Sequence, residues 1–539
     1  MAKWWVLLGV LVGCGDDGGD RVDDAATPTD SANPHPELDL AMRDQIAKAE
    51  TGELTAAQLV AGYQERITEI DHGALPINAF IAVSPTASGH ATEVDPQHGG
   101  GKLLQAAVIA VKDNIDTMDQ PTTAGSLALM ANVPAADATV IAKLRAENGI
   151  VLGKTNLSEW ANFRGNMSSS GWSAVGGQTN NGFAKGLNPC GSSSGSAAAV
   201  RAGMTSAALG TETSGSIICP ASTNGVVGFK PTVGLVSRAG VIPVSSTFDT
   251  VGPITRTVGD AARLLHVIAG PDAADPATAN IPANFDYDFE AKLGTVSLSG
   301  LRIGVITNLG FSGPVNTVFD REKAKLVAAG AVLVDITVTD LPTTFNDDVY
   351  RIMYSEFKDG IDAYLASHPE PNQPTTLQGL IDFNTANAAT ELKYFGQEAF
   401  VDAQASPGAT GSTYTTSKMT IEMAYAQQVS EVLDANNVVV LIAPSTEHAW
   451  KTQYASGDPA SASAAGIPAA FGMPHLTVPM GLVDSLPVGM SFFGRRFDDA
   501  QILAVGYAYE QLRGDLSRVT SPPHETPPKV HPAARLIAR

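Results

Sequence analysis

Apolar positions recur at helical spacing where the patterned part of the chain begins. Thr55 and Gln58 have the residue types and separation of a capping box, and Leu59, Tyr63 and Ile67 follow at intervals of four. In an α-helix such positions lie on one face. The pattern therefore predicts an amphipathic helix that opens the folded part of the chain.

Beyond this helix, short apolar runs alternate with helical patterns. Strand-like runs occupy residues 106–111, 150–152, 301–306 and 438–442, and helical patterns occupy residues 138–147 and 196–203. Uninterrupted apolar strands are typical of a sheet covered on both faces, and their alternation with helices is typical of α/β proteins. We therefore expect an α/β fold: a single large domain, residues 37–520, with a central mixed β-sheet covered by helices on both faces.

Two segments depart from this alternation. Residues 165–195 are rich in Gly, Ser and Asn and show no apolar periodicity. Loops of this length usually carry function, but a surface Ω-loop has the same composition, so both interpretations stay open. The Pro-rich tail, residues 521–539, is expected to wrap the surface or to be disordered.

Composition and charge exclude several classes of protein. The chain has 539 residues, of which 44% are hydrophobic and only 17% charged, so a large core can form. Its formal net charge of −21 repels nucleic-acid phosphates, which excludes nucleic acid as a partner. Three cysteines exclude a disulfide scaffold, and no Cys/His cluster has zinc-site spacing, so we expect no metal.

The N-terminus has the pattern of an export signal. Lys3 precedes an apolar stretch, residues 4–12, that is too short to span a bilayer and predicts a signal peptide over residues 1–14. The stretch ends in Leu-Val-Gly-Cys, which resembles the bacterial lipobox. That resemblance implies that Cys14 is acylated; the alternative is an ordinary export signal that is cleaved elsewhere.

An acidic segment follows, residues 15–36, with Gly, Ser, Thr and Pro and almost no apolar side chains, and it predicts a flexible linker. We therefore expect an exported protein of the bacterial cell envelope, a monomer that contacts the membrane only through its N-terminal lipid. Such a compartment permits disulfides. Cys190 and Cys219 could then pair, but both lie beside residues that we assign to catalysis below, and a bridge there requires a particular geometry, so we favour two free thiols.

Three short motifs lack the context that their chemistry requires. G-x-S-x-G around Ser193 would need a buried strand directly before it, but residues 186–190 form a Pro-containing loop. Ser355 and Lys358 fit S-x-x-K without the companion motifs of penicillin-recognising enzymes. Residues 149–155 resemble a phosphate-binding loop but are one residue too short and strand-like, so their lysine is expected to be structural.

A fourth motif is distributed over three places. Lys112 directly follows the apolar run 106–111, and Ser192 and Ser216 lie in two later Gly/Ser-rich loops. Further strings accompany them in order: T-T-A-G-S at 122–126, G-K-T-N at 153–156, N-P at 188–189 and G-F-K-P-T at 228–232. Together they resemble the amidase signature family. The resemblance implies a Ser–Ser–Lys triad without metal or organic cofactor, in which Ser216 is the nucleophile, Ser192 the bridging serine and Lys112 the base.

The chemistry of these residue types agrees with the roles that the resemblance implies. A serine hydroxyl becomes a good nucleophile only when a base accepts its proton, and a lysine accepts one only when neutral. Neutrality near pH 7 requires the lysine pKa to fall by roughly 3 units from about 10.4, a shift that burial can produce. Lys112 is therefore expected at a buried strand end. Ser192 can relay the proton, because a hydroxyl both donates and accepts.

The loop before Ser216 is the candidate oxyanion hole. Backbone N–H groups of Thr213, Ser214 and Gly215 are expected to face the developing negative charge, each contributing about 3 kcal/mol. The family generally has Gly where this chain has Ser214 and Cys190, and Gly permits a positive φ. Ser214 is therefore expected to adopt either an unfavourable backbone or a different local conformation.

Within the family, the chain resembles the bacterial peptide amidases from about residue 40 to 512. The strings that carry this likeness are E-T at 212–213, C-P-A at 219–221, K-P-T-V-G-L-V-S-R at 230–238, E-F-K at 356–358 and F-G-Q-E at 395–398. The resemblance implies hydrolysis of C-terminal peptide amides through an acyl-enzyme. Fatty acid or aryl amide hydrolysis is the alternative within the family, and a peptide-binding lipoprotein with a degenerate site is the alternative without catalysis. Apolar residues between 352 and 400 either line the acyl side of the site or form helix core.

Overall fold

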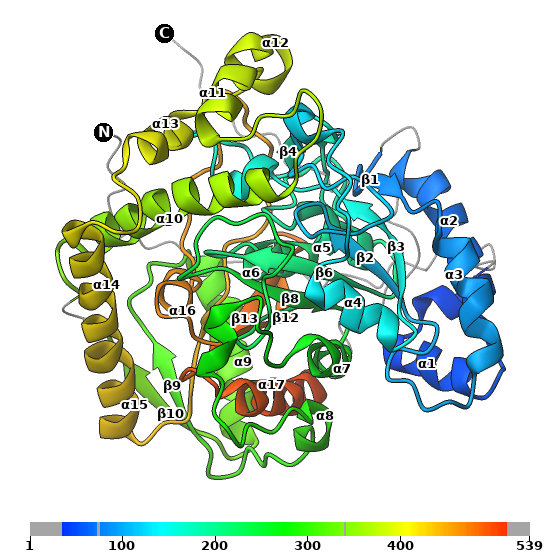
Figure 1. Ribbon diagram of the computed structural model, residues 1–539. Coiled ribbons are helices and arrows are strands. Elements are labelled where there is room, and N and C mark those ends of the chain that lie inside the picture. Colours follow the sequence, from blue (N-terminus) through cyan, green and yellow to red (C-terminus); the bar gives the residue numbers. More distant parts are fainter. Residues whose placement is uncertain (1–34, 73–75, 339–340, 515–539) are drawn as a thin grey trace, which may run out of the picture.

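A mixed β-sheet of 11 strands runs through the centre of the molecule (Figure 1). The structure, a computed structural model, describes residues 35–72, 76–338 and 341–514. The strand order is β1-β3-β2-β6-β8-β7-β12-β13-β11-β9-β10, with a separate two-stranded ribbon, β4-β5. The strands are β1 (Phe80–Val83), β2 (Val108–Lys112), β3 (Ile150–Thr155), β4 (Trp172–Ser173), β5 (Gly177–Gln178), β6 (Ala207–Glu212), β7 (Val227–Lys230), β8 (Thr250–Thr255), β9 (Arg302–Ile306), β10 (Val332–Ile336), β11 (Val440–Pro444), β12 (His475–Val483) and β13 (Leu486–Phe493).

Helices surround this sheet (Figure 1). They are α1 (Met42–Glu50), α2 (Ala56–Arg66), α3 (Ala87–Val94), α4 (Thr139–Ala146), α5 (Ser194–Arg201), α6 (Ile218–Asn224), α7 (Val258–Ile268), α8 (Phe289–Lys292), α9 (Gly313–Ala328), α10 (Phe345–Ser367), α11 (Leu377–Ala386), α12 (Ala388–Glu391), α13 (Glu398–Ala405), α14 (Ser412–Tyr425), α15 (Glu431–Asn436), α16 (Gly466–Ala470) and α17 (Asp499–Arg513). Among the described residues, no helix is both long and apolar enough to cross a bilayer.

Side chains of β2 alternate between two apolar cores, one on each face of the sheet. Ile109 and Val111 belong to the core that also contains residues of α4, α7, α9 and α17. Val108 and Ala110 belong to the core that contains residues of α2, α3 and α5. By the same alternation Lys112 is on the α5 side of the sheet. Beyond the sheet, α13 and α14 both pack on α10, on the side of the molecule away from α1, α2 and α3 (Figure 1).

These observations confirm the predicted α/β fold with a mixed sheet between helices. The predicted amphipathic helix is α2, with the capping box of Thr55 and Gln58 in place. The expectation that it opens the folded part was wrong, because α1 precedes it and packs Met42 and Ile46 into the core. The predicted signal peptide (1–14), most of the linker (15–36) and the Pro-rich tail (521–539) lie outside the described residues.

The Gly/Ser/Asn-rich segment 165–195 is not a surface loop. It contains β4 and β5, and several of its polar side chains are fully buried, including those of Ser169, Thr179, Asn181, Asn188 and Ser192. They are held by hydrogen bonds rather than apolar packing; Asn181, for example, donates to the Thr223 carbonyl oxygen at 2.9 Å. This explains why the segment has no apolar periodicity.

Candidate active site

Lys112 is the last residue of β2, and its side chain is 0% exposed. The neighbouring strand β6 is parallel to β2, so Thr211 comes close to the same point. The Lys112 Nζ donates to Ser192 Oγ at 2.7 Å, to Thr211 Oγ1 at 2.8 Å and to the Thr211 carbonyl oxygen at 3.1 Å. The predicted position of Lys112 at a buried strand end is confirmed.

Burial lowers the pKa of Lys112 to about 7, because its ammonium group loses hydration there. The negative charges of Asp249 and Glu212 oppose this shift without cancelling it. Near neutral pH the amine therefore exists partly in its uncharged form. In that form Nζ has a lone pair, and it can accept the Ser192 hydroxyl proton across the same 2.7 Å contact.

The two candidate serines lie just before two helices that pack against each other, α5 and α6. Ser192 is fully buried, and Ser216 is 8% exposed. The backbone N–H of Ser193 donates to the carbonyl oxygen of Ser216 at 3.1 Å, which holds the two loops together. Ser192 thus contacts Lys112 directly, whereas the Ser216 hydroxyl has no hydrogen-bond partner among the described residues.

A disulfide joins the Ser192 loop to the first turn of α6, the helix that follows Ser216. Cys190 and Cys219 are bonded, with their Cα atoms 5.9 Å apart, so the expectation of two free thiols was wrong. Cys190 comes shortly before Ser192, and Cys219 comes shortly after Ser216, so the bridge ties together the two segments that carry the serines. Cys190, which stands where the family generally has Gly, has a φ of 59°, in the left-handed region that Gly favours.

The loop before Ser216 presents unused backbone donors. Among the described residues, none of the N–H groups of Thr213, Ser214, Gly215 and Ser216 donates a hydrogen bond. In this loop Gly215 has a positive φ, at 80°, and Ser214 does not. Of the two conformations that we considered for Ser214, the one with an unfavourable positive φ is therefore wrong. Four free donors beside a candidate nucleophile can stabilise a developing oxyanion.

Two carboxylates, that of buried Glu212 and that of half-buried Asp249, fix this loop at its ends. Glu212 Oε2 accepts from the N–H groups of Ile217 and Ile218, at 2.7 and 3.1 Å. Asp249 Oδ1 accepts from the Thr213 hydroxyl at 2.6 Å. Sequence reasoning found neither role, nor that of Thr211 beside Lys112. No sequence signal could have identified Asp249, which is one acid among many; Thr211 and Glu212 could have been suspected because they end a strand next to the nucleophile loop.

The rejected motifs have structural roles. Ser193 is fully buried, and its hydroxyl donates to the Thr211 carbonyl oxygen at 3.1 Å. Lys154 donates to the carbonyl oxygen of Ile115 at 2.6 Å and lies 3.4 Å from Asp113, as expected for a structural lysine. Ser355 is buried in α10.

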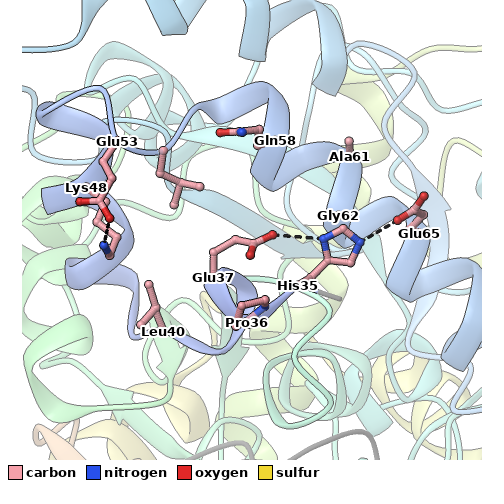
Figure 2. A pocket seen from close by; sticks show the side chains of 11 residues that line it. His35, Pro36, Glu37, Leu40, Lys48, Glu53, Gln58, Ala61, Gly62 and Glu65 are labelled. Carbon is pink, nitrogen blue, oxygen red and sulfur yellow. Dashed lines mark hydrogen bonds and ion pairs between the residues drawn. The ribbon is translucent and has the colours of Figure 1, made fainter. Parts of the chain in front are cut away.

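At least two cavities lined by described residues are large enough to hold a small molecule. One, of about 460 Å³, begins at Thr213 and Ser214 and extends between α10 and α16. The other, of about 690 Å³, lies among the N-terminal helices, where His35 is hydrogen-bonded to Glu37 and Glu65 (Figure 2). Of these two, the first is lined by Thr213 and Ser214 of the loop that precedes Ser216, and the second is lined by no residue of that loop. Among the described residues no group of three or more His, Cys, Asp or Glu could hold a metal ion.

Comparisons with known proteins agree on one family. The family model "Amidase" matches residues 58–503. A probable amidase of Arabidopsis thaliana is 36% identical over 85% of this chain and 87% of its own length. A putative amidase of Arthroderma benhamiae is 33% identical over 88% of this chain and 82% of its own. The crystal structure of the peptide amidase from Stenotrophomonas maltophilia superposes with a TM-score of 0.85 at 41% identity, covering 91% of this chain and 99% of that one. The chain therefore belongs to the amidase family and is an amide-hydrolysing enzyme.

Proposed function

We propose that this enzyme removes the C-terminal amide from peptides, with Ser216 as nucleophile, Ser192 as proton relay and Lys112 as base. The observation that carries the catalytic part is the 2.7 Å contact between Ser192 Oγ and a lysine whose pKa burial lowers to about 7. A fully buried lysine in contact with a serine hydroxyl has the environment that general-base chemistry needs.

In the first half of the reaction, neutral Lys112 accepts the Ser192 proton while Ser192 accepts that of Ser216. The Ser216 oxygen attacks the amide carbon, and the negative charge that forms on the carbonyl oxygen is stabilised by the free N–H groups of residues 213–216. The relay then returns the proton to the amide nitrogen. The C–N bond breaks, ammonia leaves, and an ester between the peptide and Ser216 remains.

In the second half, water attacks this ester, and the same relay takes its proton and returns one to the Ser216 oxygen. The products are a peptide with a free carboxylate and the regenerated enzyme. Because Ser216 is the only one of the three with an exposed fraction above zero, it is the group that a substrate can reach.

The choice of peptide amides rests on similarity to the peptide amidase of Stenotrophomonas maltophilia, at 41% identity over nearly the whole of that chain. A further solved structure of a peptide amidase, bound to the competitive inhibitor chymostatin, is also 41% identical with a TM-score of 0.86. The amidases of Arabidopsis thaliana and Arthroderma benhamiae are less identical, at 36% and 33%.

We also propose that the enzyme is exported to the bacterial cell envelope and anchored by a lipid on Cys14, as a monomer. The sequence pattern of residues 1–14 supports this proposal. The Cys190–Cys219 disulfide agrees with it, because disulfides persist in oxidising compartments and are rare in the cytosol.

Ammonia release from a panel of amides tests the substrate class. We expect kcat/KM for an amidated dipeptide to exceed that for a fatty acid primary amide or an aryl amide by about tenfold or more, which is about 1.4 kcal/mol of differential transition-state binding. Each ammonia should be matched by one dipeptide acid with its internal peptide bond intact. Faster turnover of the fatty acid or aryl amide would favour those alternatives, and no turnover of any amide would favour a binding protein.

A further inference from the structure

The residues that line the cavity beside the loop before Ser216 indicate which kind of ligand it binds. Its volume is about 460 Å³, within the range of small-molecule sites. None of the described residues that line it is charged, although the chain as a whole carries a net charge of −21. Apolar side chains of α10 form one wall, namely Phe345, Val349 and Met353, and Ile467 of α16 contributes to the lining.

The cavity is continuous with the candidate oxyanion loop, because Thr213 and Ser214 form part of its lining. A substrate whose carbonyl oxygen meets the N–H groups of this loop therefore has the cavity beside its scissile amide. The leaving group of the proposed reaction is ammonia, which has no apolar part. The cavity is uncharged and mainly apolar, although Asn308, Asn346 and Ser463 also line it, and at this place it can serve only the acyl part of the substrate.

We propose that this cavity is a specificity pocket that receives an apolar side chain, such as that of Leu or Phe, from the acyl part of the substrate. The proposal rests on the proposed function and narrows its substrate class to amidated peptides with an apolar residue at, or next to, the amidated end. Removal of a Leu or Phe side chain from water into such a pocket raises kcat/KM by about 10- to 100-fold over Gly.

The lining of the pocket also shows which apolar residues of α10 contact the cavity and which form helix core, a choice that the sequence left open. Ile352 and Phe357, on α10, are fully buried in two core clusters and do not line the cavity. Met353 lines it, and so do Phe345 and Val349 from the preceding turns of the same helix. The specificity residues therefore begin earlier in the chain than residue 352.

Amidated dipeptides test the proposal when Gly, Leu, Phe or Asp is placed at each position in turn. The wild-type full-length protein should prefer Leu or Phe over Gly by about 10- to 100-fold at one of the two positions, and should disfavour Asp there. Turnover of all dipeptide amides at equal rates would overturn the pocket but not the proposed function. Turnover of none would overturn both.

Val349→Asp supplies the matched test of the pocket itself, because it places a carboxylate on the cavity wall. It should lower kcat/KM for the Leu and Phe amides by about tenfold or more relative to kcat/KM for the Gly amide. The control is Val327→Asp, the same change at a valine of α9 that is 53% exposed and outside the cavity, which should alter none of these rates. An equal loss on all amides, or no loss on the Leu amide, would contradict the proposal.

Discussion

Replacing Ser216 by Ala should lower kcat for ammonia release from an amidated dipeptide by roughly 10⁴- to 10⁶-fold, the loss seen when serine hydrolases lose their nucleophile. The variant keeps the backbone N–H groups of the loop, so substrate binding should persist while the acyl-enzyme cannot form. The measurement is ammonia release under saturating substrate, together with thermal unfolding to check that the fold is intact.

Ser355→Ala is the matched control for this experiment. Ser355 is also a buried serine, it belongs to the competing S-x-x-K motif, and its hydroxyl has no hydrogen-bond partner among the described residues. Removing that hydroxyl should leave kcat within about twofold of wild type, since no hydrogen bond is lost. Normal turnover by Ser216→Ala, or a large loss in Ser355→Ala, would show that the nucleophile is assigned to the wrong serine.

Lys112→Met should be nearly as damaging as Ser216→Ala, with a loss in kcat of about 10⁴-fold, because a nucleophile and its base act as one unit. Methionine has nearly the shape of the lysine stem but cannot accept a proton. For the same reason, the double variant Lys112→Met/Ser216→Ala should be no slower than the slower of the two single variants.

Two further substitutions separate loss of the base from loss of a structural contact. Lys112→Arg preserves a cationic donor that is always protonated, so it should be as inactive as Lys112→Met. Lys358→Met makes the same change in the competing motif, where the lysine donates to the carbonyl oxygens of Gln404 and Ser406, and it should retain activity. Substantial activity in Lys112→Arg would mean that the lysine only holds Ser192 in place.

Strands and helices of the core could be predicted from the sequence because their apolar periodicity reflects burial directly. The apolar residues 106–111 also predicted that Lys112 is buried, since a side chain at the end of a strand covered on both faces has little access to water. The placement of Lys112 near Ser192 and Ser216 came from the family resemblance, because contacts between loops that are distant in sequence leave no periodic signal.

Features that depend on the relative position of two loops could not be predicted. The Cys190–Cys219 bridge requires Cα atoms at a suitable separation, here 5.9 Å, and sequence alone gives no such distance. The role of Asp249 is similar, because it reaches Thr213 only after β8 is placed beside β6. The backbone of Ser214 could not be predicted either, since Gly215 next to it takes the positive φ.

The pH dependence of kcat/KM tests most directly whether a neutral lysine drives the reaction. Burial lowers the pKa of Lys112 to about 7, and only its deprotonated form accepts a proton, so the rate should fall as the pH drops below about 7. Glu510, a buried carboxyl of α17 whose pKa burial raises to about 7, titrates in the same range, so the measurement should be repeated with Glu510→Gln. The account predicts a single acid limb with an apparent pKa near 7 in both proteins; a rate that stays constant down to pH 5, or a limb that disappears in Glu510→Gln, would contradict it.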